Sequence, residues 1–290
     1  MESEGDPGRL QALLGELARL RPAADPQGWI GRMWRARRRQ RLLVRLDRDW
    51  PGGFTLHEDG ALLYVPRPLD ARGRHALLYP PRAHPAALAC LRPGAVAADI
   101  GAGLGEWTLP FARAVGSQGR VLAVEAAPGS AAALANTLIA NALHQAERVA
   151  CAAGEHDGVI DFAVPVARLG EARIGAHETV RVPLKSLDSL AAERRLHRLD
   201  LIKITVGGQE REVLDGAEAT LDRFRPALVL ATGREAEGDR PAIHYRLRSL
   251  GYRPVGILLE DGMAEAGWQS YVAEEPPFRP GQKHRLLLVA

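Results

Sequence analysis

Apolar residues repeat at two different periods along this chain, and the change between them divides it into two parts. Residues 8–20 repeat apolar side chains at the period of a helix, and a second helix is predicted over 28–47. The alternating runs 54–57 and 61–65, separated by a turn that ends in Gly60, predict a β-hairpin. We therefore expect residues 1–94 to form an N-terminal accessory region of helices and a hairpin.

From residue 95 to the end of the chain, short apolar runs alternate with segments of helical period. Strands are predicted at 96–100, 121–125, 147–152, 199–206 and 226–231, helices at 83–91, 105–115, 129–143, 209–222 and 241–250, and a closing antiparallel pair at 252–259 and 285–289. Two short strands within 158–184 interrupt the alternation. The run 199–206 is almost wholly apolar, as a parallel strand buried on both faces should be. This order predicts an α/β domain over 95–290 with a doubly wound, Rossmann-like sheet covered by helices on both faces.

One loop in this second region has the features of a nucleotide-type cofactor site. The stretch from Asp99 to Glu106 carries glycines at 101, 103 and 105 between an apolar strand and a helical segment. Glycine permits tight turns, and without a Cβ it lets a ligand approach the backbone. Glu125 ends the next strand twenty residues after Gly105, a spacing at which an acid accepts hydrogen bonds from ribose hydroxyls.

The glycine spacing also discriminates between cofactors. A dinucleotide site reads G-x-G-x-x-G, whereas this chain reads G-x-G-x-G after Asp99. We expect a negative charge at Asp99 to repel a phosphate and to attract a cationic ligand. S-adenosylmethionine has a sulfonium, an ammonium and no phosphate, and the pattern resembles the class I methyltransferases. The predicted cofactor-binding residues are Asp99, Gly101, Ala102, Gly103, Gly105, Glu106, Glu125, Ala126, Ala152 and Ala153, with the turn 151–154 against the adenine.

Two further stretches narrow the resemblance. Residues 133–143 contain two asparagines five positions apart, and residues 200–217 begin Asp-Leu-Ile-Lys-Ile-Thr-Val-Gly-Gly. Together with the loop they resemble the FkbM family of S-adenosylmethionine-dependent methyltransferases over roughly 95–235. The resemblance implies methylation of hydroxyl groups on small molecules or sugars, often in natural-product or glycan pathways.

The chain departs from the family motif on the presumed substrate side. Where the family usually reads Ile-Lys-Ile-Asp-Val-Glu-Gly-Ala-Glu, Thr205 and Gly207 replace two acids, while Lys203, Gly208 and Glu210 remain. The next strand ends in Ala231-Thr232-Gly233 where an acid is usual. Those acids could have served as a base, or could have held a metal or an ammonium group.

Lys203, Thr205 and Glu210 are the candidate catalytic residues that the motif leaves. Transfer to a hydroxyl benefits from a base, but threonine is no base near neutral pH. Glu210 equally fits the first turn of a helix, where a negative charge is favoured, and Lys203 equally fits a structural ion pair. His75 and His244 are further candidates that no motif ties to the site. No Cys/His cluster has zinc spacing, so no metal is predicted.

Composition limits the environment and the partners. The 290 residues carry a net charge of +3, two cysteines and no apolar run long enough to span a membrane. The acidic N-terminus does not read as a secretion signal, so a cytoplasmic protein with reduced, buried thiols at Cys90 and Cys151 is expected. Eight arginines between Arg32 and Arg48 indicate either a nucleic-acid surface or a solvated helix whose leucines and tryptophans dock on the main domain. The favoured partner is a small-molecule or glycan-like substrate, and the sequence leaves the oligomeric state open.

Three functions remain open at this point. The first is a methyltransferase acting on a hydroxyl of a small or sugar-like substrate. The second is a catalytically degenerate member that keeps the fold and serves as a binding or assembly subunit. The third and least favoured is an RNA methyltransferase that uses the arginine-rich helix.

Overall fold

The computed structural model describes residues 7–20, 29–57, 60–67, 69, 71–79, 83–165, 177–260, 262–278 and 282–290. The chain divides into two compact units, Met1–Pro80 with Ala163–Glu178, and Pro81–Phe162 with Thr179–Ala290. This division falls before the boundary near residue 94 that the sequence suggested. The physical reason is that Ala83, Ala87 and Ala95 are buried in one cluster with Phe111 and Val121 of the second unit.

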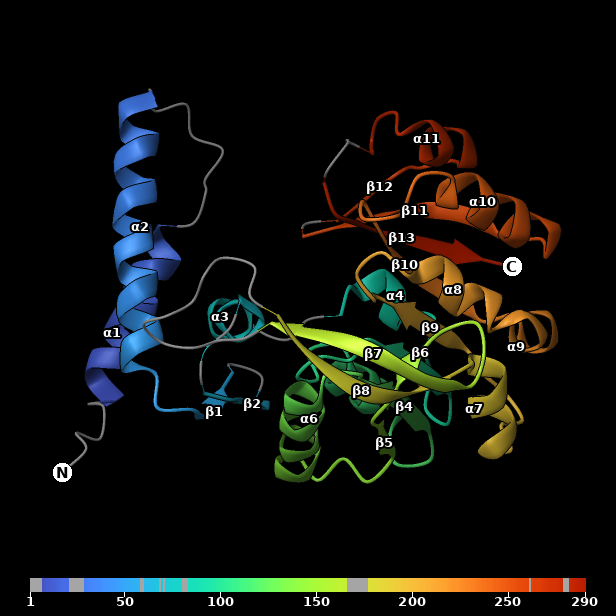
Figure 1. Ribbon diagram of the computed structural model, residues 1–290, viewed down its shortest axis with the longest axis horizontal. Helices are drawn as coiled ribbons and strands as arrows, with labels where there is room; N and C mark the ends of the chain where they lie inside the picture. Colours follow the sequence, from blue (N-terminus) through green and yellow to red (C-terminus); the bar gives the residue numbers. More distant parts are fainter. Residues whose placement is uncertain are drawn as a thin grey trace. The chain divides into compact units, whose positions relative to one another are not determined.

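The first unit contains the helices and the hairpin expected from the periodicity (Figure 1). Its elements are α1 (Pro7–Arg19), α2 (Trp29–Asp49), β1 (Gly53–Leu56), β2 (Leu62–Val65) and α3 (Ala71–Leu78). The hairpin is antiparallel, with Phe54 opposite Tyr64. Helix α3 was not expected from the periodicity, because its eight residues are too few for a clear helical repeat.

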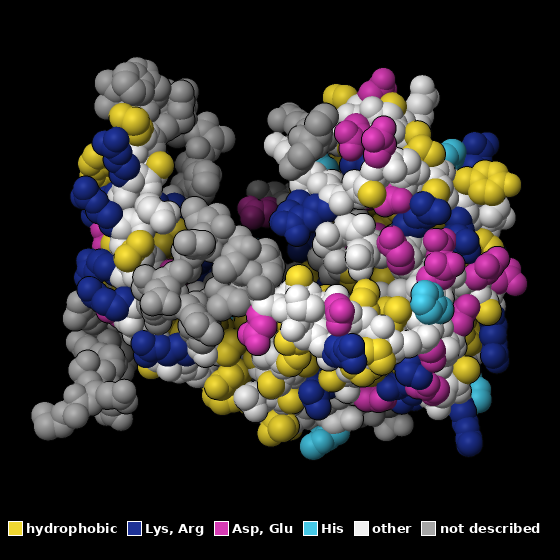
Figure 2. Space-filling view, viewed as in Figure 1, with side chains coloured by type: hydrophobic (Ala, Val, Ile, Leu, Met, Phe, Trp, Pro, Cys, Tyr) yellow, Lys and Arg dark blue, Asp and Glu magenta, His cyan; other side chains and the backbone are white. Residues whose placement is uncertain are grey.

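The arginine-rich helix α2 has a buried leucine stripe and a charged face. Leu42 and Leu46 are buried, and Arg38 donates a hydrogen bond to Glu16 of α1 at 3.0 Å. Figure 2 shows Lys and Arg side chains gathered along this helix, with apolar side chains between them. The tryptophans of this unit differ in their environment, and the Nε1 of Trp50 donates to the carbonyl of Val65 in the same unit at 3.2 Å. Trp50 is buried, but Trp34 is 57% exposed, and the guanidinium of Arg38 lies 5.2 Å from its ring centre.

The second unit is built on an eight-stranded sheet in the order β12-β11-β13-β10-β9-β3-β4-β5. The strands are β3 (Val96–Ile100), β4 (Arg120–Val124), β5 (Ala146–Val149), β9 (Leu201–Ile204), β10 (Ala227–Thr232), β11 (Arg253–Leu259), β12 (Gly262–Ala264) and β13 (His284–Val289). The strands from β10 to β5 in this order are parallel, and β13 is antiparallel to both β10 and β11. The predicted α/β class and the closing antiparallel pair are therefore confirmed.

Helices cover the sheet on both faces (Figure 1). They are α4 (Pro85–Leu88), α5 (Thr108–Val115), α6 (Pro128–Ala140), α7 (Leu187–Glu193), α8 (Glu210–Asp215), α9 (Glu218–Phe224), α10 (Asp239–Ser249) and α11 (Trp268–Ala273). Successive strand residues enter different clusters: Leu201 packs with Phe111 of α5, whereas Ile202 packs with Leu221 of α9. Burial on both faces explains why the parallel strands are continuous apolar runs.

One helix predicted from the sequence is divided in two in the structure, at a point where two backbone segments approach closely. The segment 209–222 forms two helices, α8 and α9, with Gly216 between them. A Cβ at Gly216 would lie 2.0 Å from the carbonyl oxygen of Gly154, so the chain must bend where only glycine fits. The predicted helix over 83–91 is likewise shortened to α4. Among the described helices, none combines the length and the apolar character that a membrane crossing requires.

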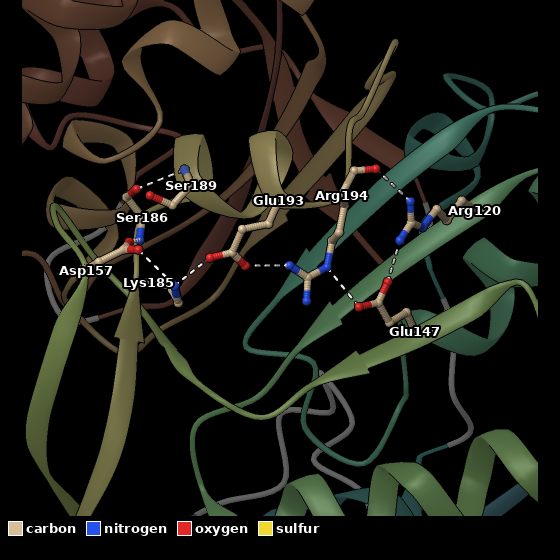
Figure 3. A network of polar contacts seen from close by, with 8 residues as sticks. All are labelled: Arg120, Glu147, Asp157, Lys185, Ser186, Ser189, Glu193 and Arg194. Carbon is tan, nitrogen blue, oxygen red and sulfur yellow. Dashed lines mark hydrogen bonds and ion pairs between the residues drawn. The ribbon is translucent and has the colours of Figure 1, made fainter.

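A smaller sheet, in the order β6-β8-β7, follows β5 along the chain, with strands β6 (Ala152–Ala153), β7 (Gly158–Pro165) and β8 (His177–Lys185). Figure 3 shows the polar network beside it. Lys185 contacts Asp157 at 2.9 Å and Glu193 at 2.5 Å. Arg194 continues the network to Glu147 of β5 at 2.8 Å. This network connects the small sheet, α7 and β5.

Candidate functional site

Asp99 and Lys203 form a buried ion pair under the glycine loop. Asp99 is fully buried at the end of β3, and its Oδ1 lies 2.9 Å from Nζ of Lys203 on the neighbouring strand β9. The hydroxyl of Thr108 donates to the other carboxylate oxygen at 2.7 Å, and Lys203 also donates to the carbonyl of Gly101 at 2.8 Å. The charge of Asp99 is thus balanced inside the protein. Direct attraction of a cationic ligand by Asp99, as the sequence suggested, does not match this arrangement.

The loop glycines are required largely by packing. Gly101, Gly103 and Gly105 all have positive φ, at 76°, 65° and 109°. A Cβ on Gly101 would lie 2.0 Å from the carbonyl oxygen of Thr205, and one on Gly105 would lie 3.2 Å from side-chain atoms of α6. Two of the glycines therefore let the end of β9 and helix α6 approach the loop, a reason that differs from the ligand approach expected from sequence.

Glu125 lies against the loop, as its spacing from Gly105 predicted. Its carboxylate is buried and accepts hydrogen bonds from the amides of Gly103 at 2.7 Å and Ala127 at 2.9 Å. Glu106 accepts from the amide of Leu104 at 3.0 Å. The amides of Gly103 and Leu104, which could otherwise hold a phosphate, therefore already donate to carboxylates. The negative charges of these carboxylates would also repel a phosphate. A carboxylate has about four acceptor positions, which suits the hydroxyl donors of a ribose.

The remaining predicted cofactor residues lie on the segments next to Glu125. The amide of Ala102 donates to Val124 at 2.9 Å, and half-buried Ala126 directly follows Glu125. The amide of Glu125 donates to Val149 at 3.0 Å, which places the end of β5 and the turn with Ala152 and Ala153 beside it. The loop, the end of β4 and this turn therefore lie next to one another at the carboxyl ends of the parallel strands.

Neither cysteine has the environment of a nucleophile. Cys151 is buried, and burial raises its pKa to about 11, so the thiol stays protonated at neutral pH. Cys90 is half-buried rather than fully buried as expected, and burial raises its pKa as well. Both thiols are free.

Glu210 and Thr205 lie at the end of β9, on the presumed substrate side. The carboxylate of Glu210 accepts from the amides of Val206, Gly207 and Gly208 at 3.0, 3.1 and 2.9 Å, which closes the turn before α8. Burial raises the pKa of Glu210, although hydrogen bonds from backbone amides, including those of Val206 and Gly208, oppose the shift. The hydroxyl of Thr205 is buried and, in the part of the chain that the structure describes, has no hydrogen-bond partner.

A cavity of about 160 Å³ lies at this edge of the sheet. It is lined by Thr205, Gly207, Glu210, Ala231, Thr232, Arg234, Leu258, Lys283, His284 and Arg285. Because β13 runs antiparallel to β10, its first residues lie beside the end of β10, with His284 opposite Thr232. Thr205 and Glu210 thus line the cavity, whereas Lys203 lies under the glycine loop.

The basic residues of this cavity were not among the residues predicted from the sequence. Arg234 follows β10, and Lys283 and Arg285 come from the start of β13. The available signal was the Lys-His-Arg run at the start of a strand predicted to be antiparallel. An antiparallel strand begins at the edge where parallel strands end, so its first residues face the site.

The two histidine candidates lie elsewhere. His75 belongs to α3 of the first unit and stacks on Tyr79 at 4.6 Å between ring centres. His244 lies on α10, 5.0 Å from the ring of Trp268, and burial lowers its pKa. Among the residues with described positions, no group of three or more His, Cys, Asp or Glu side chains could hold a metal ion.

Comparison with known proteins adds the family. The family described as "Methyltransferase FkbM domain" matches residues 99–254. A protein-L-isoaspartate O-methyltransferase from Triticum aestivum is 29% identical over 176 residues, which are 57% of this chain and 68% of that protein.

Among solved structures, the methyltransferase FkbM from Methylobacillus flagellatus is 15% identical, with a TM-score of 0.45 over 97% of this chain and 59% of its own. A fibrillarin from Aeropyrum pernix with natively bound S-adenosylmethionine is 12% identical, with a TM-score of 0.39 over 69% of this chain and 67% of its own. Since the family match begins at Asp99 and spans more than half of the chain, this protein belongs to the FkbM family of S-adenosylmethionine-dependent methyltransferases.

Proposed function

We propose that this protein transfers a methyl group from S-adenosylmethionine to a hydroxyl oxygen of a small-molecule or sugar-like substrate bound in the cavity beside the glycine loop. The observation that carries the proposal is the position of Thr205. Its carbonyl packs against Gly101 of the loop, and the same residue lines the cavity. Arg285 also connects the cavity to the segment that follows the glycine loop. It lines the cavity, and its guanidinium lies 5.3 Å from the ring centre of Trp107.

Residues on the strand ends would hold the cofactor, whose sulfonium supplies an electrophilic methyl group. Glu125 would accept hydrogen bonds from the ribose hydroxyls, and the turn 151–154 would pack against the adenine. Asp99 and Lys203 would act by holding the loop in position, since both are buried and paired with each other. We therefore assign Lys203 a positioning role.

The substrate side would work mainly by orientation. The hydroxyls of Thr205 and Thr232 are buried at the cavity and have no hydrogen-bond partner among the residues described, so both could bond the acceptor. Glu210 is the carboxylate of the cavity lining, and its oxygens hold three backbone amides. Alignment of an acceptor oxygen with the transferred methyl can by itself supply much of the rate.

A non-catalytic role in binding or assembly is the second candidate. The observation in its favour is that Thr205 and Gly207, which line the cavity, stand where the family motif has acids. The stretch Ala231-Thr232-Gly233 likewise stands where an acid is usual. RNA methylation is the third, favoured by the exposed arginines of α2 and the exposed ring of Trp34.

The test is to incubate the full chain with radiolabelled S-adenosylmethionine and a panel of sugars and hydroxylated small molecules. We expect label to enter at least one acceptor, with a mass increase of one methyl group. Calorimetric binding of S-adenosylhomocysteine without transfer to the panel or to a cell extract would overturn the proposal in favour of the non-catalytic role. RNA binding that weakens steeply with salt, and is lost when Arg35, Arg37, Arg38 and Arg39 become alanine, would favour the third.

A further inference from the structure

Three cationic side chains converge on the cavity. Arg234 extends from the loop after β10, and Lys283 and Arg285 lie at the start of β13. None of the three forms a salt bridge with a carboxylate of the described residues. Arg240, by contrast, is paired with Glu274 at 2.9 Å. The cavity therefore has three exposed cations at its rim without a carboxylate contact, and of the three, Arg285 is within the electrostatic influence of Glu106 and Asp99.

A glycine makes room for one of these cations. A Cβ at Gly207 would lie 3.7 Å from Nη1 of Arg234, so the guanidinium lies over the position that carries no side chain. Gly208 packs under the same residue, since a Cβ there would lie 2.6 Å from the carbonyl oxygen of Arg234. An acidic side chain at position 207 would meet this guanidinium. Its absence leaves the arginine directed to the cavity.

The electrostatics of the lining favour a negatively charged ligand. Partial desolvation and the like charges of Arg234 and Arg285 lower the pKa of Lys283. Glu210 is the acid in the lining, and its oxygens are engaged by backbone amides. An anion in the cavity would relieve the repulsion between the cations and offer them charge-assisted hydrogen bonds.

Two buried hydroxyls complete the set of donors. Thr232 is 3% exposed, and its Oγ1 has no hydrogen-bond partner in the described part of the chain. Thr205 Oγ1, directly after the adjacent strand β9, is also buried and has no hydrogen-bond partner among the described residues. A buried hydroxyl without a partner is costly, so a ligand that offers acceptor oxygens would stabilise both.

We propose that this cavity binds an anionic oxygen group, a carboxylate or a phosphate, on the methyl acceptor. Arg234, Lys283 and Arg285 provide the charge, and Thr205 and Thr232 donate hydrogen bonds. The assignment of this anion to the methyl acceptor rests on the proposed function, whereas the anion site itself does not.

The experiment is calorimetric titration of the full chain, saturated with S-adenosylhomocysteine, with inorganic phosphate and separately with acetate at constant ionic strength. We expect at least one of the two to bind, and the tighter one identifies the class of group. Arg234→Gln and Lys283→Gln should each weaken binding about tenfold or more, the size of a lost charge-assisted hydrogen bond. Arg253→Gln, which removes an exposed charge on β11 outside the lining, should leave it unchanged.

The outcomes separate the two proposals. Absence of phosphate and acetate binding, or equal affinities in the two cavity variants and the control, would overturn the anion site. Anion binding with the expected variant effects, but no methyl transfer to any acidic or neutral acceptor, would keep the anion site and overturn the proposed function. Thr232→Val provides a neutral check, because it should weaken anion binding without any change in net charge.

Discussion

Asp99 and Lys203 lie opposite each other on the adjacent parallel strands β3 and β9, and their side chains form an ion pair of 2.9 Å in the interior. The two side chains are 0% and 4% exposed. Removing both charges from water is costly, and the pair is tolerated because each charge has the other together with further hydrogen bonds. The pair also fixes the loop, since Lys203 donates to Gly101.

Lys203→Met should destabilise the protein by about 3–5 kcal/mol, because it leaves Asp99 charged and buried without its partner. The measurement is urea unfolding at neutral pH. The double variant Asp99→Asn, Lys203→Met should lose less than the sum of the two single variants. Arg181→Met is the control, since the Arg181–Asp161 pair is 84% and 68% exposed at 3.6 Å and should contribute less than about 1 kcal/mol. A Lys203 variant as stable as this control would contradict the structural role.

Gly101→Ala should destabilise the protein by more than about 1 kcal/mol, because the new Cβ would collide with the carbonyl oxygen of Thr205 and the φ of 76° is strained for alanine. Gly129→Ala is the matched control. Gly129 lies in α6 with no atom within 4 Å of its Cβ position, so alanine should be neutral or stabilise by up to about 1 kcal/mol. Thermal unfolding of the two variants side by side measures the contrast, and equal shifts would contradict it.

The parallel sheet could be predicted from the sequence because its strands are buried on both faces and stand out as apolar runs. Short elements such as α7 and α11 were missed, since six or seven residues give no clear period. The break between α8 and α9 depends on Gly154, which is distant in sequence from Gly216. Local patterns therefore fixed the order of the main elements but not their ends.

The residues of the site also fall into those that the sequence could predict and those that it could not. The loop and Glu125 could be predicted because their spacing along the chain follows from the strand-turn-helix geometry. The partner of Lys203 could not, because Asp99 is 104 residues away and is adjacent only in the folded sheet. Arg234 and Lys283 were missed for a related reason, since only the antiparallel register of β13 brings the end of the chain to the substrate side.

Asp157 should make stability depend on pH in the acid range. Hydrogen bonds from the amide of Ser186 and from Lys185 lower its pKa to about 2 in the folded protein. A lowered pKa means that the contribution is fully present above the unfolded value near 4 and is lost as the pH falls towards 2. Asp157→Asn should therefore flatten part of the stability profile between about pH 4 and 2, measured by urea unfolding. Asp222→Asn, at an exposed site on α9, should leave the profile unchanged.

Glu125→Ala should weaken binding of S-adenosylhomocysteine by about 1–3 kcal/mol, the range for loss of a hydrogen bond to a charged group. The reason is that Glu125 is the buried carboxylate at the end of β4, held against the amide of Gly103 at 2.7 Å. Isothermal titration calorimetry measures the change, with Asp222→Ala as the control. Unfolding curves of both variants must show a folded protein, because Glu125 also accepts from Ala127.

A ligand lacking the 2′-hydroxyl tests the assignment to the ribose directly. If Glu125 holds the ribose hydroxyls, the 2′-deoxy form of S-adenosylhomocysteine should bind the wild-type protein more weakly than the parent compound. The Glu125→Ala variant should bind the two ligands with nearly equal affinity, because the carboxylate that distinguishes them is gone. A double-mutant cycle with no coupling between the side chain and the hydroxyl would place the ribose elsewhere. The amides of Gly103 and Ala127 would then be the main partners of Glu125, and its role would be to shape the loop.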